Sequence, residues 1–366
     1  MRVCSPALGL DPDAHLGGAV YDRELLSAMA AEGVEVDILL PEGERFTPRP
    51  HWRVTRTPRH RRSYYEYNWI FFRALRRQWR AAPAEILRVH SPYSIGPGAL
   101  AFARQTRVPV VLHYLHREPR PLWTAADRLL LRRYASVITI SETTRDDLLA
   151  HYSLRPQRIV VAYPGVSERF QPAAGRSNGS GLVVLHVGAL IPRKNLLNAL
   201  RAFAGACRTG LEMQFVIAGE GPEEQALRLA AAELQVASRV RFTGRITEEE
   251  KIRLYQSSDI LLFPSVREGF GMVAAEALAC GVPVIGNSRT STREIVRHGV
   301  SGLLVDQPAD AEALGAALGE LARDPERRRA YGEAGRCDVR QRFSWPRSAR
   351  QVIEAYRSVL AAERAA

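Results

Sequence analysis

Two carboxylates, Glu268 and Glu276, stand eight positions apart in the stretch FPSVREGFGMVAAEALACGVPVIG, residues 263–286. If the second lies about two turns into a helix, at ~1.5 Å per residue, the two groups are roughly 10–12 Å apart. Paired carboxylates that act on one glycosidic bond need about 5–9.5 Å. The spacing therefore favours two groups that hold opposite ends of a longer polar ligand through vicinal hydroxyls, such as a sugar at one end and a ribose at the other.

The residues between the two carboxylates predict a turn followed by a helix. Gly269 and Gly271 let the backbone approach a ligand, and good helix formers follow over residues 272–279. The first amide groups of a helix have no partner inside it, and with the positive end of the helix dipole they bind anions or hydroxyls. Apolar runs at 260–263 and 282–285 flank this unit and predict strands.

A second group of residues suits a diphosphate. Arg193 and Lys194 follow the predicted strand 182–187 at the turn into a helix. The predicted strands 214–218 and 240–244 each end in glycine, at Gly219 and Gly244. Strands that alternate with helices predict a parallel, doubly wound sheet, which binds ligands at the carboxyl ends of its strands.

The first half of the chain shows the same alternation. Gly18 belongs to a glycine pair before a predicted helix, and His113 ends a predicted strand at the ligand edge. On chemistry alone, a tight turn and a structural histidine explain these two residues. A polar linker at 170–181 predicts a boundary between two domains, which we place at 1–168 and 169–345, with 346–366 as a final segment.

Taken together, these segments resemble the retaining glycosyltransferases of family 4, over almost the whole chain. The matching segments are PS-x-x-EGFG with its Glu-x7-Glu pair, the G-x-x-x-P-R-K loop at 188–194, the G-x-G-P turn at 219–222, the hinge at 163–166 and Phe343-Ser344-Trp345. The resemblance implies an α/β protein with the GT-B fold. Two Rossmann-like domains would face a central cleft, and the last helix would cross back to the first domain.

The resemblance also implies a reaction and its residues. A hexose would move with retention from a nucleotide diphosphate sugar, GDP-mannose or a UDP-hexose such as UDP-glucose, to a glycan, lipid-linked or small-molecule acceptor. No cofactor and no metal would be needed. His113 would meet the donor sugar, with His116 as the weaker candidate, Lys194 the diphosphate, Glu268 the sugar and Glu276 the ribose. The other donor-binding positions are Gly18, Arg193, Gly219, Arg245, Ile246, Gly269, Phe270, Gly271 and Met272.

One position departs from the family pattern. Many members have arginine directly after the glycine of the phosphate loop, where this chain has Ala189. Arg193, four residues later, is the candidate to supply the missing cation.

Residues 53–80 carry nine arginines and seven aromatic residues within a chain of formal net charge +12. Three interpretations stay open: a core-packed helix with a solvated arginine face, a surface for an anionic membrane or lipid-linked acceptor, and nucleic-acid binding. The last lacks any helix-turn-helix, zinc-finger or RNA-binding signature, so we expect no nucleic-acid partner. Helical spacing predicts an apolar face of Trp69, Phe72, Leu75 and Trp79, and a basic face of Arg73, Arg76, Arg77 and Arg80.

The bulk sequence predicts a cytoplasmic protein. The membrane interpretation of residues 53–80 would place it peripherally on the inner face of the membrane. No run of about 18 apolar residues occurs, the amino terminus does not read as a secretory signal, and the four cysteines are scattered.

Two other functions stay open. A nucleotide-sugar epimerase of the same fold would act on the donor without an acceptor, and a basic membrane- or nucleic-acid-binding protein would have no nucleotide affinity.

Overall fold

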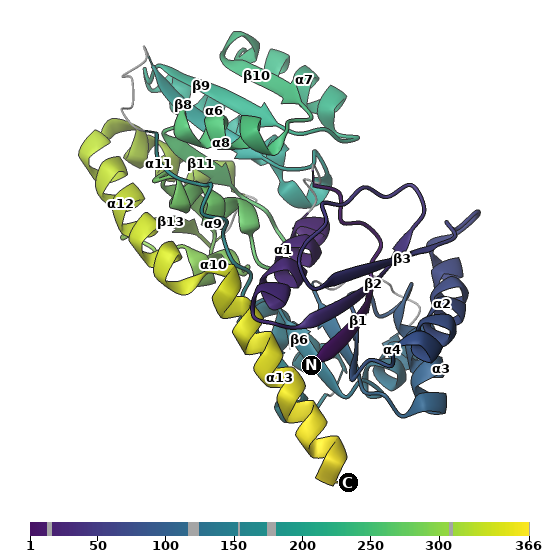
Figure 1. The fold of residues 1–366 in the computed structure, drawn as a ribbon. Helices are drawn as coiled ribbons and strands as arrows, with labels where there is room; N and C mark the ends of the chain where they lie inside the picture. The colour runs from purple at the N-terminus through teal and green to yellow at the C-terminus, as the bar shows by residue number, and fades with distance from the viewer. Residues whose placement is uncertain (13–16, 116–123, 153, 174–180, 307–309, 366) are drawn as a thin grey trace. The chain divides into compact units, whose positions relative to one another are not determined.

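The computed structural model describes the whole chain except residues 13–16, 116–123, 153, 174–180, 307–309 and 366 (Figure 1). The chain divides into two compact units. The first domain consists of residues 1–165 and 344–366, and the second domain of residues 166–343. Both ends of the chain therefore belong to the first domain.

The first domain is built on a seven-stranded parallel sheet in the order β3-β2-β1-β4-β5-β6-β7. Its strands are β1 (Arg2–Pro6), β2 (Glu35–Pro41), β3 (Trp52–Thr57), β4 (Ile86–Val89), β5 (Val110–Tyr114), β6 (Ser136–Thr139) and β7 (Ile159–Val161). Its helices are α1 (Gly17–Ala31), α2 (Tyr67–Ala81), α3 (Gly96–Thr106), α4 (Thr124–Leu131), α5 (Glu142–Tyr152) and α13 (Trp345–Ala365).

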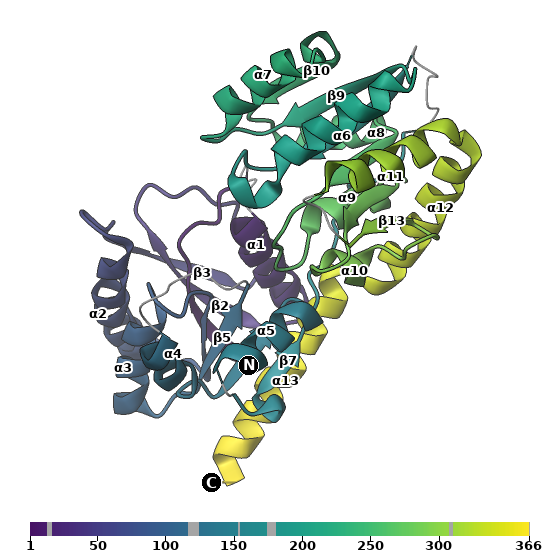
Figure 2. The same cartoon turned by 180° about the vertical axis from the view of Figure 1, so that it is seen from behind.

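Helices cover both faces of this sheet, which explains why most of its strands are almost entirely buried (Figures 1 and 2). On one face, Phe71 of α2 and Phe102 of α3 share a core with Leu87 and Leu112 of the strands. On the other face lie α1 and α13. The edge strand β3 was not predicted, because its residues alternate between arginine and small polar or apolar side chains rather than forming an apolar run.

Helix α2 packs on the core with most of its predicted apolar face. Leu75 is buried, and Phe72 and Trp79 are partly buried and pack edge-on against Phe102 of α3. The exception is Trp69, which is 62% exposed, with the Arg73 guanidinium 6.0 Å from the centre of its ring. The fully buried residues of the helix are Tyr67, Phe71, Leu75 and Gln78, so the core-facing stripe is centred away from Trp69.

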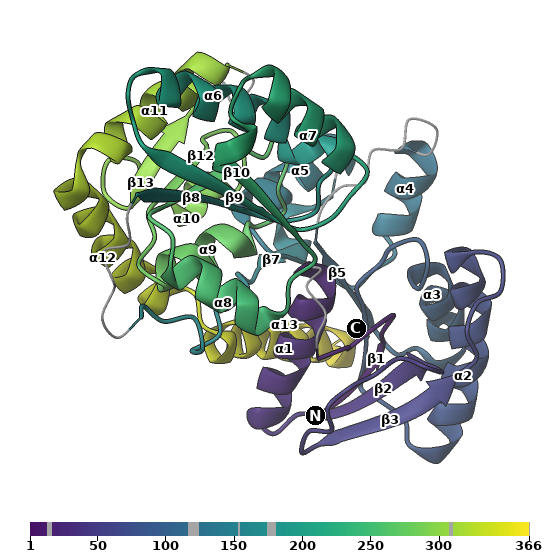
Figure 3. The same ribbon diagram turned by 90° about the horizontal axis from the view of Figure 1, so that it is seen from above.

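The second domain is built on a six-stranded parallel sheet in the order β10-β9-β8-β11-β12-β13 (Figure 3). Its strands are β8 (Leu182–Val187), β9 (Met213–Ala218), β10 (Val240–Gly244), β11 (Ile260–Phe263), β12 (Val284–Asn287) and β13 (Gly302–Val305). Its helices are α6 (Leu196–Arg208), α7 (Glu224–Glu233), α8 (Glu248–Gln256), α9 (Met272–Ala279), α10 (Thr292–Ile295), α11 (Ala311–Arg323) and α12 (Pro325–Arg342). Among the described residues, no helix is long and apolar enough to cross a membrane.

Candidate active site in the second domain

The loops that follow β8 and β11 bring a lysine and a glutamate together at the carboxyl edge of the second sheet. The Lys194 Nζ lies 2.5 Å from Oε1 of Glu268, and an Arg193 guanidinium nitrogen lies 3.5 Å from the same oxygen. The Lys194 and Glu268 side chains are only 8% and 10% exposed, whereas Arg193 is 47% exposed. The structure thus places Lys194 and Arg193, which were predicted to bind the phosphates, beside Glu268, which was predicted to bind the sugar.

Hydrogen bonds between the two loops hold this arrangement. The Val266 amide donates to the Arg193 carbonyl at 2.9 Å. The side chain of Asn195 donates to the Pro264 carbonyl at 3.3 Å, from a residue with left-handed backbone (φ 58°). The cations and the carboxylate are therefore attached to one connected piece of backbone.

Two polar residues after β12 support the Glu268 loop from its other side. The Ser291 hydroxyl donates to the carbonyls of Phe270 (2.8 Å) and Glu268 (3.2 Å). The Asn287 side chain donates to the Ser265 carbonyl at 3.0 Å. Both residues were missed in the sequence, although their place just after an apolar strand is a signal for this edge of the sheet.

Glycines let the loops approach each other at backbone distance. A Cβ on Gly219 would lie 1.9 Å from the Gly188 carbonyl oxygen, and one on Gly221 would lie 2.3 Å from the Leu190 carbonyl oxygen. Gly271, with φ 105°, turns the chain into α9. Because the first amides of any helix lack partners within it, this turn adds hydrogen-bond donors to the edge that carries Lys194.

A buried histidine lies under Lys194. His186 in β8 has no exposed area, and its ring stacks on Phe263 with centroids 6.4 Å apart. Burial, with a smaller contribution from the Lys194 charge, lowers the pKa of His186 to about 3. The imidazole is therefore neutral at physiological pH and does not compete with Lys194 for an anion.

Glu276, which was predicted to bind the ribose, lies buried between two helices. It is 3% exposed, one carboxylate oxygen lies 2.9 Å from Lys251 Nζ, and the other accepts a hydrogen bond from the Tyr255 hydroxyl at 3.0 Å. Lys251 and Tyr255 both belong to α8. In this structure Glu276 therefore ties α9 to α8, and its contact with a ribose stays a prediction.

The remaining predicted donor-binding residues of the second domain lie on the same edge. Phe270 is 2% exposed and packs edge-on against Phe343 with ring centroids 5.2 Å apart, so its ring belongs to the core. Met272 is half-buried in the first turn of α9. Arg245 is exposed and Ile246 half-buried, directly after β10.

In the first domain, His113 lies near the end of β5 with both ring nitrogens engaged. It has no exposed area, its Nδ1 lies 2.9 Å from the Tyr21 hydroxyl, and its Nε2 lies 2.7 Å from the Tyr356 hydroxyl. Its place in β5 turns the ring toward α1 and α13, and burial, followed by the charge of Arg88, lowers its pKa well below the ordinary value. A contact between His113 and a donor sugar stays a prediction. Gly18 is exposed in the first turn of α1, and His116 lies outside the described residues.

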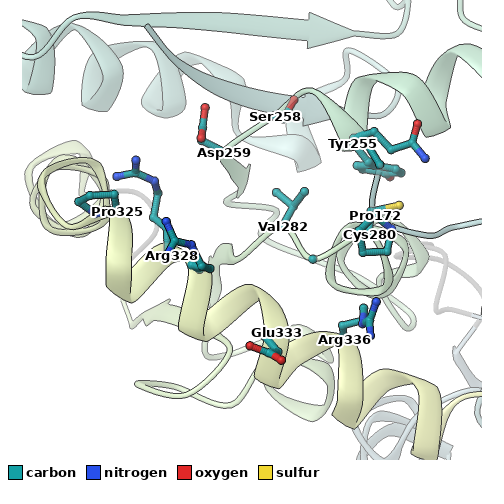
Figure 4. A pocket seen from close by; sticks show the side chains of 14 residues that line it. Pro172, Tyr255, Ser258, Asp259, Cys280, Val282, Pro325, Arg328, Glu333 and Arg336 are labelled. Carbon is teal, nitrogen blue, oxygen red and sulfur yellow. The ribbon is translucent and has the colours of Figure 1, made fainter. Parts of the chain in front are cut away.

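A cavity of about 510 Å³ lies at the opposite edge of the second sheet (Figure 4). Its walls include Ser258 and Asp259, which precede β11, and Val282, which precedes β12. It therefore lies at the amino ends of these strands, away from Lys194. Among the described residues, no group of three His, Cys, Asp or Glu side chains could hold a metal ion.

Comparison with known families agrees with this geometry. The model of "Glycosyl transferases group 1" matches residues 167–338, and the model of "Glycosyltransferase Family 4" matches residues 17–170. The chain belongs to this glycosyltransferase family. Lys194 and Glu268 lie in the part of the chain that matches the group 1 model. The fold of the chain is GT-B.

Two relatives of this glycosyltransferase family member are 28% and 36% identical to it over the matched parts of the chain. D-inositol 3-phosphate glycosyltransferase of Thermobispora bispora is 36% identical over 64% of the chain and 56% of its own length. MMP alpha-(1->4)-mannosyltransferase of Mycolicibacterium hassiacum is 28% identical over 72% of the chain and 62% of its own length. The chain therefore spans less than two thirds of these relatives.

A solved structure shows the same fold over the full length. Sucrose-phosphate synthase from Thermosynechococcus elongatus superposes with a TM-score of 0.86 and covers 99% of both chains, at 23% sequence identity.

Proposed function

We propose that this protein is a retaining, metal-independent glycosyltransferase that moves a hexose from a nucleotide diphosphate sugar to an acceptor hydroxyl. The observation that carries the proposal is the Lys194–Glu268 pair at the carboxyl edge of the second sheet, beside Arg193 and the start of α9. Cations and a carboxylate in contact suit a ligand that has phosphates next to sugar hydroxyls.

The proposed chemistry depends on the charge that grows on the departing diphosphate. Lys194, Arg193 and the first amides of α9 would stabilise that charge from fixed positions, which is the main way preorganised sites accelerate such reactions. On donor binding, Lys194 would exchange its contact with Glu268 for a phosphate oxygen. Glu268 would then accept hydrogen bonds from the donor sugar.

The donor we propose is GDP-mannose or a UDP-hexose, and the acceptor is a glycan, a lipid-linked sugar or a small molecule. Arg245 and Ile246, which follow β10, would line the base. We place the protein in the cytoplasm.

A thermal-shift panel of UDP-, GDP- and ADP-sugars tests the proposal and identifies the base. A ligand at about 100 times its Kd adds about 2.7 kcal/mol to the unfolding free energy, so the correct donor raises the Tm and the others do not. Incubation with that donor alone separates the alternatives, because an epimerase would convert it without an acceptor. A protein that no nucleotide sugar stabilises would contradict the proposal.

Replacement of the central cation gives a sharper test. Lys194→Met should lower the transfer rate by roughly 10²–10³-fold, the loss typical of one transition-state charge stabiliser, while the protein remains folded. Arg201→Met, which removes an exposed charge from α6, is the matched control and should keep the wild-type rate. Equal rates in Lys194→Met and wild type would refute the phosphate role.

The exposed face of α2 supports a peripheral contact with an anionic membrane. Trp69 is 62% exposed and shares this face with Arg73, Arg76, Arg77 and Arg80, all exposed. Each basic residue near such a surface contributes about 1 kcal/mol, screened by salt. Sedimentation with phosphatidylserine vesicles should fall with added salt and in Arg73→Ser/Arg77→Ser, but not in the control Arg208→Ser/Arg228→Ser. Equal binding to neutral vesicles would contradict this proposal.

A further inference from the structure

The strand order of the first sheet reverses between β1 and β4. In open parallel sheets, ligands bind beside such a reversal, at the carboxyl ends of the two strands. Helix α1 follows β1 here, and His90 is the first residue after β4. The topology therefore places His90 and the start of α1 at the natural ligand position of the first domain.

A buried carboxylate orients His90. The Nδ1 of His90 lies 2.9 Å from Oδ2 of Asp22, which belongs to α1. The other oxygen of Asp22 contacts the guanidinium of Arg88, which has no exposed area and also donates to the Ser5 hydroxyl at 3.1 Å. Arg88 thus holds the carboxylate in place, and the carboxylate lies against Nδ1 of the imidazole.

This arrangement defines what the other ring nitrogen can do. A carboxylate beside Nδ1 favours the tautomer that carries its proton there, and in that tautomer Nε2 is a hydrogen-bond acceptor. Burial alone would raise the pKa of Asp22, but Arg88 and His90 outweigh it and hold that pKa well below its usual range. The His90 side chain keeps 13% of its surface exposed, and within the described parts of the chain Nε2 makes no hydrogen bond.

Comparison with His113 argues against a purely structural role for His90. The register of β4 and β5 pairs Val89 with Leu112, so the two histidines are neighbours at the ends of adjacent strands. His113 has hydroxyl partners at both nitrogens and no exposed area. Among the described residues, His90 has a polar neighbour at Nδ1 alone, the Asp22 carboxylate, and its ring is partly exposed, as expected for a ring that meets a ligand.

We propose that His90 is an acceptor-binding residue, whose Nε2 accepts a hydrogen bond from a hydroxyl of a polyhydroxylated acceptor. Asp22 and Arg88 are positioning residues that set the tautomer and direction of the ring. This inference rests on the proposed transfer of a sugar to an acceptor hydroxyl.

Histidine ring nitrogen NMR on the full chain tests the contact. The protein is first saturated with UDP or GDP, whichever raises its Tm, and then titrated with myo-inositol and with methyl α-D-glucopyranoside as probes. We expect His90, assigned through His90→Gln, to carry its proton on Nδ1 and to shift at Nε2 during the titration. In Asp22→Asn the new amide can donate to Nδ1, so the proton should move to Nε2.

Kinetics with the same probes completes the test. His90→Gln should lower kcat/KM for the probe acceptor about tenfold, the worth of one hydrogen bond, while hydrolysis of the donor and nucleotide affinity stay unchanged. His51→Gln, which alters an exposed histidine paired with Glu35 at 2.8 Å, is the control and should behave as wild type.

The outcomes are distinct. If no nucleotide binds, the proposed function fails. If the nucleotide binds but neither probe shifts the His90 resonance, or if His90→Gln transfers to the probe like wild type, the role of His90 is overturned while the proposed function stands.

Discussion

At the residue scale, the second domain contains a buried neutral histidine, so a fall in pH should lower the unfolding free energy of this domain. His186 is neutral and fully buried, and burial lowers its pKa to about 3 from an ordinary value near 6.5. Between these values the unfolded chain binds a proton that the folded domain does not. Its stabilising contribution is complete above pH ~6.5 and is lost as the pH falls toward about 3, by about 1.4 kcal/mol per pH unit.

The prediction is checked by the unfolding free energy of the second domain as a function of pH. The acid-side slope should be smaller in His186→Asn than in wild type. His51→Gln changes an exposed ring of the first domain and should leave the slope as it is. If His186→Asn and wild type lose stability in parallel between pH 6.5 and 4, the buried neutral imidazole is not responsible.

At the element scale, a buried ion pair joins α8 to α9. Lys251 and Glu276 are almost fully buried, and Tyr255 supplies a further hydrogen bond. Removal of one partner leaves a buried charge, which costs about 3–5 kcal/mol, whereas replacement of both by apolar residues is often neutral or stabilising. Lys251→Met should therefore destabilise the second domain, and Lys251→Met/Glu276→Leu should recover most of the loss.

Urea unfolding of the two variants and of Glu276→Leu alone measures this coupling as a double-mutant cycle. Losses that simply add in the double variant would show that Lys251 and Glu276 act independently.

At the element scale, some features of the fold and the site could be predicted from the sequence and others could not. The Glu268 loop, the phosphate loop at 188–194 and the strands around them were predictable, because glycine turns and apolar runs are local signals. The orientation of single side chains was not. His113 was placed at the right strand end, but which face of β5 it occupies depends on register and on α13, which is more than 200 positions away. Glu276 likewise pairs with two residues of α8, which lie 21 and 25 positions earlier in the chain. The buried stripe of α2 depends in the same way on its packing against α3.

At the scale of the whole molecule, the last helix completes the first domain. Tyr356 of α13 bonds His113, and Arg350 lies 2.8 Å from Glu32 at the end of the first helical segment. Deletion of residues 344–366 should therefore destabilise the first domain selectively. Hydrogen exchange should show lost protection in β5 and α1 but retained protection in β8 and β9.

Tyr356→Phe is the matched mild variant, because it keeps the helix and removes only the hydroxyl, at a cost of about 1 kcal/mol. Equal loss of protection in both domains after the deletion would contradict the assignment of α13 to the first domain.

The division of the chain also sets an order of events during its synthesis. Residues 166–343 form one uninterrupted unit, whereas the first domain needs residues from both ends. A ribosome delivers the whole second domain before it makes α13. We expect the inserted domain to fold while the nascent chain is still attached, and part of one sheet face in the earlier-made domain to stay uncovered until α13 has been made.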